Sequence, residues 1–268
     1  MLEDYRRSFG EAYEAVIRTI RQRGEFPTGR LAKSTRSIVE KLGRESIRLS
    51  QMQDIAGCRV VVANIMQQEQ FVASLKTDFV GASVIDRRDK PSYGYRAVHI
   101  IAMISGKPVE IQVRTSLQHR WAELSEKSSD VLDPTIKYGG GPAELRRILT
   151  KSSEEVASYE VLEATHHKFE TECSEVVKSK EEAVAAHEKS KKAVAKLLKR
   201  HLPDHEVRRI QGKMQGSTRE LVLLEQDVAE LQGNVEDLTR KMVRLWNLNA
   251  DLLAKAISWL DKLKGKKQ

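Results

Sequence analysis

Hydrophobic residues in the first half of the chain recur at two different spacings. Phe9, Tyr13, Val16, Ile17 and Ile20 follow the period of a helix and predict one over residues 2–22. Apolar runs and alternations predict further elements in chain order, namely a helix over 34–42, a strand over 58–63, a helix over 66–79, a strand over 82–86, hairpin strands over 95–104 and 109–113, and a helix over 116–127. This order predicts an α+β domain in which helices pack on a mixed β-sheet.

The second half of the chain has helical patterning only. Proline and glycine at 133–134 and 139–142 mark a boundary, so we expect one domain over 1–138 and an all-α extension over 143–268. We predict long helices over 143–200 and 205–264, broken near Pro203. The second helix has a seam at alternating steps of four and three residues, made of Leu224, Val228, Leu231, Val235, Leu238, Met242, Leu245, Asn249, Leu252, Ala256, Trp259 and Leu263. This seam suits an intrachain helical hairpin and also a parallel coiled-coil dimer; the short break favours the hairpin.

Composition narrows the class of protein. The chain has 268 residues, 40% hydrophobic and 31% charged, which is typical of a soluble protein. No apolar run approaches the roughly 20 residues that cross a bilayer, and the N-terminus lacks the apolar core of a secretory signal. With two cysteines and no disulfide pattern, we expect a cytoplasmic protein without a membrane partner. The net charge of +8 permits a nucleic-acid partner without requiring one.

Polar residues on the last predicted strand indicate where the chemistry lies. Glu110, Gln112 and Arg114 occupy alternate positions, so they share one face of the sheet. A polar strand face is expensive to bury and is typical of a site for a charged ligand. Asp54 supplies a second carboxylate just before another strand. Two separated carboxylates among many basic residues predict metal-assisted chemistry on a phosphorylated substrate.

Four blocks in the chain carry a family resemblance. In order they cover residues 30–41, 54–59, 94–99 and 110–115, including Asp54-Ile-Ala-Gly-Cys-Arg59 and Gly94-Tyr-Arg-Ala-Val-His99. Together they resemble the synthetase domain of RelA/SpoT-type alarmone synthetases, and the small single-domain synthetases most of all. The resemblance covers roughly residues 5–140 and implies a nucleotidyltransferase-like core.

The resemblance implies a role for each acidic residue. Asp54 and Glu110 match the pair that holds Mg²⁺ against the ATP phosphates, and Glu110 also matches the group that takes the proton from the attacking hydroxyl. Without the resemblance, Asp54 would be interpreted as a turn or cap residue and Glu110 as an exposed strand end.

It also implies contacts to the donor nucleotide. Arg59 resembles the arginine that stacks on the adenine of ATP. The arginine on the other side of the base departs from the family spacing, because Arg30 lies three residues before Lys33 instead of two; either Arg30 still reaches the base or Arg36 replaces it. Cationic contacts to phosphate are expected from Lys33, Lys41 and Lys90.

Four residues are expected to bind the acceptor or to support its site. Tyr95 resembles the tyrosine that stacks on the acceptor base, and His99 lies on the same predicted strand face. Gln112 and Arg114 complete that face, with Arg114 near phosphate or holding Glu110.

The resemblance therefore implies an enzyme, a nucleotide pyrophosphokinase of the GTP diphosphokinase type. It would transfer the β,γ-pyrophosphate of ATP to the 3′-hydroxyl of GDP or GTP, forming (p)ppGpp and AMP. Two alternatives stay open: a toxic relative that pyrophosphorylates the 3′ end of tRNA, and a degenerate synthetase acting as a coiled-coil interaction protein. The extension could also join copies into a homo-oligomer.

Overall fold

The computed structural model describes residues 2–198 and 203–265, which divide into two compact units. The first contains Met1–Glu160 and Leu245–Gln268, and the second contains Val161–Arg244. These units are not the ranges 1–138 and 143–268 drawn from the sequence, because the beginning of the first long helix and the end of the second belong to the first unit. The division into functional domains stays a prediction.

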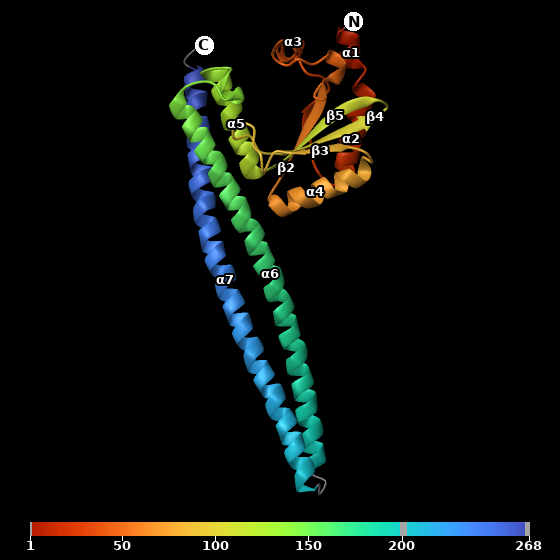
Figure 1. The fold of residues 1–268 in the computed structure, drawn as a ribbon, viewed down its shortest axis with the longest axis vertical. Helices are drawn as coiled ribbons and strands as arrows, with labels where there is room; N and C mark the ends of the chain where they lie inside the picture. Colours follow the sequence, from red (N-terminus) through yellow and green to blue (C-terminus); the bar gives the residue numbers. More distant parts are fainter. Residues whose placement is uncertain (1, 199–202, 266–268) are drawn as a thin grey trace. The chain divides into compact units, whose positions relative to one another are not determined.

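The first unit is built on a five-stranded mixed sheet (Figure 1). Its strands are β1 (Thr28–Arg30), β2 (Ala56–Val62), β3 (Ser83–Asp86), β4 (Val98–Ile104) and β5 (Lys107–Thr115). The spatial order is β1-β2-β5-β4-β3, with β2 and β5 parallel and the other pairs antiparallel. The predicted α+β class with a mixed sheet is confirmed.

Helices and short 3₁₀ turns precede, connect and follow these strands. They are α1 (Leu2–Arg7), α2 (Gly10–Gln22), α3 (Thr35–Arg44), η1 (Leu49–Gln51), α4 (Ile65–Asp78), α5 (Ser116–Val131) and η2 (Ile136–Tyr138). The single helix predicted over 2–22 is wrong, because the chain breaks between α1 and α2. Gly10 is a poor helix former, and Phe9 is fully buried with its ring 5.3 Å from that of Tyr5.

Two further differences concern the strands. The three-residue strand β1 was not predicted, because it is short and contains glycine. β4 begins at Val98, so Tyr95 lies in the loop before the strand and not on it. The hairpin turn is also tighter than expected, since Ser105 and Gly106 join β4 to β5 with φ of 49° and 73°.

One face of the sheet forms the hydrophobic core with α2 and α4. Val109, Ile111 and Val113 of β5 are fully buried there, and Ile20 of α2 and Leu75 of α4 pack in the same cluster. This face contains the apolar alternate residues of each central strand. The opposite face is therefore left for polar residues.

The extension consists of α6 (Ala143–Leu198) and α7 (Asp204–Gly265). Within the second unit the helices run antiparallel, with His166 Nε2 2.7 Å from Thr239 Oγ1 and His187 Nδ1 3.0 Å from Ser217 Oγ. The helical extension is confirmed, and the pairing is that of an intrachain hairpin. Parts of the predicted helix end and break, residues 199–202, lie outside the described residues. Coiled-coil dimerisation stays a prediction.

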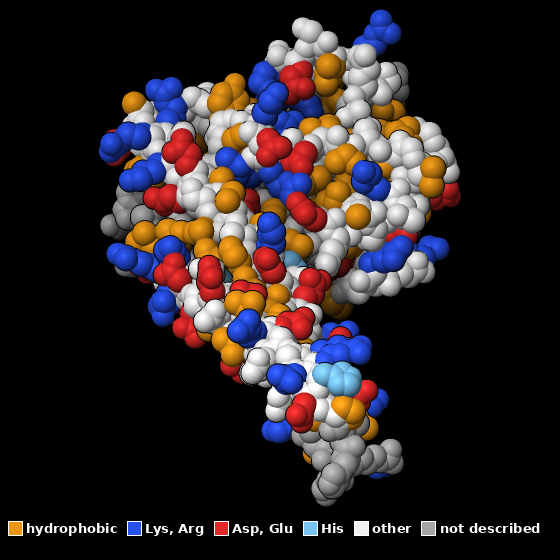
Figure 2. Space-filling model, turned by 60° about the horizontal axis from the view of Figure 1, so that its bottom comes forward, with side chains coloured by type: hydrophobic (Ala, Val, Ile, Leu, Met, Phe, Trp, Pro, Cys, Tyr) orange, Lys and Arg blue, Asp and Glu red, His pale blue; other side chains and the backbone are white. Residues whose placement is uncertain are grey.

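Charged side chains of both signs are interspersed over the face shown in Figure 2. This distribution does not by itself indicate a polyanionic partner. Across the described helices, none is both long enough and apolar enough to cross a membrane.

Candidate active site

The polar face of the sheet lines a cavity of about 460 Å³. Glu110, Gln112 and Arg114 of β5 lie there, as their alternation predicted, and Arg59 of β2 is paired in register with Gln112. The described residues that line the cavity are Thr28, Gly29, Arg30, Asp54, Gly57, Cys58, Arg59, Glu110, Gln112, Arg114 and Glu126. Asp54 and Glu110, 56 positions apart in sequence, therefore line the same cavity.

Asp54 is held in the loop before β2 by two lysines. The backbone N–H of Lys33 donates to the carbonyl of Ile55 at 2.6 Å, which ties the segment before α3 to this loop. Lys33 Nζ then lies 2.6 Å from Asp54 Oδ2, and Lys41 Nζ from α3 lies 3.0 Å from Oδ1. Burial raises the pKa of Asp54, but the hydrogen bonds and charges of the two lysines outweigh it and hold that pKa below its usual value. Asp54 is thus ionised at neutral pH.

Each carboxylate oxygen of Glu110 has a hydrogen-bond partner from a neighbouring side chain. His99 Nδ1 lies 2.8 Å from Oε1, and Gln112 Nε2 donates to Oε2 at 2.8 Å. Burial raises the pKa of Glu110, but the contacts with His99 and Gln112 outweigh burial and hold that pKa below its usual value. The negative charge of Asp54 acts in the opposite sense and raises this pKa.

Gly57 lines the cavity and lies close to the backbone of Glu110. It pairs in register with Glu110 across β2 and β5. A Cβ at position 57 would lie 3.0 Å from the carbonyl oxygen of Glu110 and 3.5 Å from its Cβ. A side chain there would crowd Glu110, so glycine is the residue that this close approach favours.

Two arginines of the cavity have unused hydrogen-bond donors. Arg59 Nη2 lies 3.3 Å from Glu126 Oε1, and Arg114 Nη2 lies 3.8 Å from the same oxygen. Within the described part of the chain, Arg59 Nε and Arg114 Nε and Nη1 are buried without a hydrogen-bond partner. Buried donors of this kind are costly unless a ligand supplies acceptors. The oxygens of a phosphate group would meet that need.

Tyr95 lies beside this cluster although it is outside β4. Its hydroxyl is 2.9 Å from His99 Nε2 and accepts a hydrogen bond from Arg114 Nη2 at 3.0 Å. The Arg114 guanidinium also lies 4.9 Å from the centre of the Tyr95 ring. The structure therefore joins Tyr95, His99, Gln112 and Arg114 in one network. Stacking of Tyr95 on a base stays a prediction.

The remaining predicted residues fall into two groups. Arg30 lines the cavity on β1, on the same sheet face as Arg59. Arg36 is 88% exposed on α3 and pairs with Glu40 at 2.8 Å, outside the cavity lining. Lys90 is exposed in the loop before Tyr95 and is also outside that lining. The geometry thus brings Arg30, and not Arg36, to the side of Arg59.

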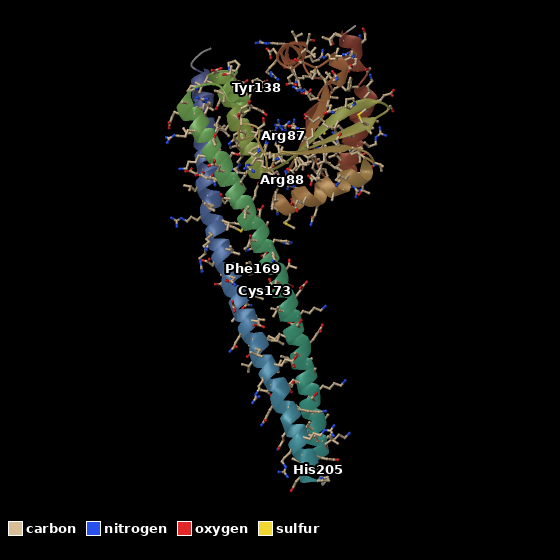
Figure 3. The ribbon with its side chains drawn as sticks, viewed as in Figure 1. Arg87, Arg88, Tyr138, Phe169, Cys173 and His205 are labelled. Carbon is tan, nitrogen blue, oxygen red and sulfur yellow. The ribbon has the colours of Figure 1, made fainter. Side chains whose placement is uncertain are left out.

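One cavity residue and one residue on the polar face of the sheet were not predicted from the sequence. Glu126 lines the cavity from α5, but its helical position gives no sign of this. Arg87 follows β3 (Figure 3), and its N–H donates to the carbonyl of Ala97, which extends the ladder between β3 and β4 by one residue. Since Ile85 pairs with His99, Arg87 falls on the same sheet face as His99. The alternation of β3 could have indicated this.

The carboxylates fit a divalent cation that keeps part of its coordination for a substrate. Among the described residues, no group of three or more His, Cys, Asp or Glu side chains is placed to hold a metal ion. Mg²⁺ commonly takes one or two protein carboxylates and completes its shell with water and phosphate oxygens. Asp54 and Glu110 offer that donor set, because each carboxylate oxygen keeps a second lone pair beside its protein partner.

A family comparison covers the part of the chain that contains these residues. Residues 29–129 match a family model described as the region found in RelA / SpoT proteins. Uncharacterized proteins of Mycobacterium tuberculosis and Mycobacterium bovis are each 36% identical over 118 residues. That match covers 42% of this chain and 43% of each relative, so it spans less than half the length of either protein.

Solved structures also resemble the chain. The small alarmone synthetase 1 of Bacillus subtilis bound to its product pppGpp is 27% identical, with a TM-score of 0.44, over 60% of this chain and 91% of that chain. A second structure of the same Bacillus subtilis protein is 29% identical, with a TM-score of 0.43, over 64% of this chain and 95% of that chain.

Proposed function

We propose a nucleotide pyrophosphotransferase activity for this chain, whose residues 29–129 match the region found in RelA / SpoT proteins. The β,γ-pyrophosphate of ATP moves to the 3′-hydroxyl of GDP or GTP, and AMP is released. The observation that carries this proposal is the convergence of Asp54 and Glu110 on one cavity that is also lined by Arg30, Arg59 and Arg114.

Asp54 and Glu110 are the residues that would hold Mg²⁺. The bound ion would neutralise charge on the ATP phosphates, which lowers the barrier to attack by an electron-rich hydroxyl. Lys33 and Lys41 keep Asp54 ionised before substrate binds. Neither lysine is among the described residues that line the cavity, but both lie within 3.0 Å of the Asp54 carboxylate, which does. Phosphoryl transfer depends mainly on positioning and charge neutralisation, so this surplus of cations supports the proposal.

Glu110 is the proposed general base. The acceptor 3′-oxygen attacks the β-phosphorus of ATP, the bond from that phosphorus to the α,β-bridging oxygen breaks, and AMP leaves with the bridging oxygen. The hydroxyl proton passes to a carboxylate oxygen of Glu110, which is ionised because His99 and Gln112 lower its pKa. His99 and Gln112 also fix the orientation of the carboxylate through one contact on each oxygen.

The arginines are proposed to bind the two nucleotides. Arg30 and Arg59 lie on neighbouring strands of the same sheet face, and planar guanidinium groups in that arrangement can flank an adenine ring. The unpartnered Nε of Arg59 donates to a phosphate oxygen of ATP, and the unpartnered Nε and Nη1 of Arg114 donate to phosphate oxygens of the acceptor. In this proposal Tyr95 stacks on the acceptor base, and the contacts of its hydroxyl with Arg114 and His99 support that role by fixing the position of the side chain.

The acceptor is tested directly by transfer of label. The protein is incubated with Mg²⁺ and γ-labelled ATP, and separately with GDP, GTP, adenine nucleotides or deacylated tRNA. Label on GDP or GTP together with release of AMP supports the proposal. Label on tRNA alone establishes the tRNA-modifying alternative, and transfer to no acceptor favours the degenerate synthetase.

A further inference from the structure

The first turns of α6 contact the loop that carries Tyr95. Ser153 is 3% exposed, and its Oγ donates to the carbonyl of Gly94 at 2.7 Å and accepts from Arg96 Nε at 3.1 Å. Gly94 has φ of +89°, and a Cβ there would lie 2.6 Å from Trp121 Cζ2 and 3.3 Å from Ser153 Cβ. The loop on either side of Tyr95 is therefore held between α5 and α6.

A second residue of α6 contacts the end of β5. Glu160 is 7% exposed, and its Oε1 accepts from Thr115 Oγ1 at 3.1 Å and from Gln118 Nε2 at 2.6 Å. Thr115 directly follows Arg114 and is the N-cap of α5, where it forms a capping box with Gln118. Gln118 Oε1 in turn accepts from Gln68 Nε2 of α4 at 2.8 Å. Glu160 is thus part of a buried polar network that fixes the residue after Arg114.

These two contacts converge on one pair of site residues. Ser153 and Glu160 are seven positions apart, so they lie on the same face of α6. Through them the helix supports both the loop of Tyr95 and the strand end of Arg114, and these two side chains are joined by the hydrogen bond of 3.0 Å. Trp121 Nε1 adds a third link by donating to the carbonyl of Leu149, one turn before Ser153.

We propose that Ser153 and Glu160 are positioning residues for the acceptor side of the active site. The inference rests on the proposed function, and it assigns a role to the base of the helical extension, beyond residues 29–129 that match the family model. Asp54 is held differently, by Lys33 and Lys41. Loss of the α6 contacts therefore weakens acceptor binding and leaves ATP binding largely intact.

Steady-state kinetics of point variants in the full chain test this selectivity. Ser153→Ala removes both contacts to the Tyr95 loop. Glu160→Met removes the carboxylate oxygen that accepts from Thr115 and Gln118 and keeps a side chain of similar length. We expect the KM for the acceptor to rise roughly 10-fold in each variant, the usual effect of losing a buried hydrogen bond. The KM for ATP should stay within about twofold, since none of the described contacts of Asp54 is made by α6.

Two matched variants separate positioning from general damage. Glu160→Gln keeps an oxygen that accepts from Thr115 and Gln118, and should therefore behave like the wild type. Ser158→Ala alters an exposed serine of the same helix, whose hydroxyl donates only within α6 to the carbonyl of Glu154, and should change neither KM. Equal increases in both KM values, or an unchanged acceptor KM in Ser153→Ala and Glu160→Met, would overturn the inference.

Hydrogen exchange makes the result independent of activity. If the wild type transfers pyrophosphate to no acceptor, the proposed function fails, but the positioning contacts can still be measured. Ser153→Ala should speed amide exchange in residues 93–97, and Glu160→Met in residues 113–118. Residues 54–59 should exchange as in the wild type, because they belong to the other side of the site. Unchanged exchange in both target segments would also overturn the inference.

Discussion

The two faces of the sheet are made from alternate residues of the same strands but have different physical roles. On β5, Val109, Ile111 and Val113 are fully buried in the hydrophobic core. Between them, Glu110 and Gln112 face the cavity. Burial of the apolar face stabilises the fold at every position. Burial of the polar face costs solvation free energy, which only hydrogen bonds and ion pairs with specific partners offset. A single step along one strand therefore separates a residue that stabilises the core from a residue that lines the cavity.

The polar face tolerates its charges because each carboxylate has a partner on both oxygens. Burial alone would raise the pKa values of Asp54 and Glu110, yet both values are lowered. The lysines achieve this for Asp54, and His99 with Gln112 for Glu110. Both carboxylates are therefore ionised at neutral pH, whereas donors on Arg59 and Arg114 lack a partner within the described residues.

The largest expected effect on the polar face is that of Glu110→Gln. We expect AMP release to fall by roughly 10²–10⁴-fold, because the amide accepts no proton from the acceptor hydroxyl. The urea midpoint should change little, since the substitution preserves the shape and one acceptor oxygen. Glu11→Gln, at an exposed position of α2, is the matched control. Activity close to that of the wild type would remove Glu110 from the mechanism.

Its counterpart on the apolar face is Ile111→Ala, one residue along β5. Truncation of this fully buried side chain should lower the free energy of unfolding by about 2–5 kcal/mol. Urea unfolding measures the loss, and kcat per folded molecule should remain near that of the wild type below the transition. A strong fall in kcat without loss of stability would show that the two faces are not functionally separate.

A smaller effect is expected from Lys41→Met, which tests the pairing of Asp54. The lowered pKa of Asp54 stabilises the fold above the usual aspartate value near 3.8, and this contribution is lost as pH falls through the pKa of the folded state. The variant should therefore lose about 1 kcal/mol of unfolding free energy at neutral pH. That difference from the wild type should shrink in acid, as measured by urea unfolding across pH. A difference that persists in acid would assign it to packing.

The smallest expected effect concerns Glu126, whose side chain is about half exposed and lies near two cavity arginines. Glu126→Gln removes a competing anion, so binding of a non-hydrolysable ATP analogue should strengthen by about 0.2–1 kcal/mol, the usual value of an exposed ion pair. Titration calorimetry measures the change. Asp130→Asn, at an exposed position of the same helix, is the control. Weaker binding in Glu126→Gln would show that Glu126 instead orients the arginines.

Much of the fold could be predicted because hydrophobic periodicity is local. The alternation of β5 placed Glu110, Gln112 and Arg114 on one face, and the structure has them there. Elements whose signal is weak were missed or misplaced. β1 has only three residues, and the break before α2 depends on the burial of Phe9. Thr115 and Gln118 have the spacing of a capping box, which marks the start of α5 in the sequence itself.

The choice between Arg30 and Arg36 needed the tertiary structure. Both residues lie in the same block of sequence, and spacing alone left them equivalent. Pairing of β1 with β2 places Arg30 at the cavity, whereas α3 places Arg36 in an exposed pair with Glu40. Which of the two contacts adenine stays a prediction.

The sequence by itself determined the α+β class of the fold and the polar face of β5, because both follow from hydrophobic spacing within single elements; the roles of Asp54 and Glu110 came from the family resemblance and stay predictions. The tertiary structure decided that Asp54 and Glu110 share a cavity and that Glu126 reaches it. It also decided that Ser153 contacts Gly94, the residue before Tyr95, and that Glu160 contacts Thr115, the residue after Arg114. Contacts between residues 45 to 67 positions apart depend on how whole elements pack, and no local pattern encodes that packing.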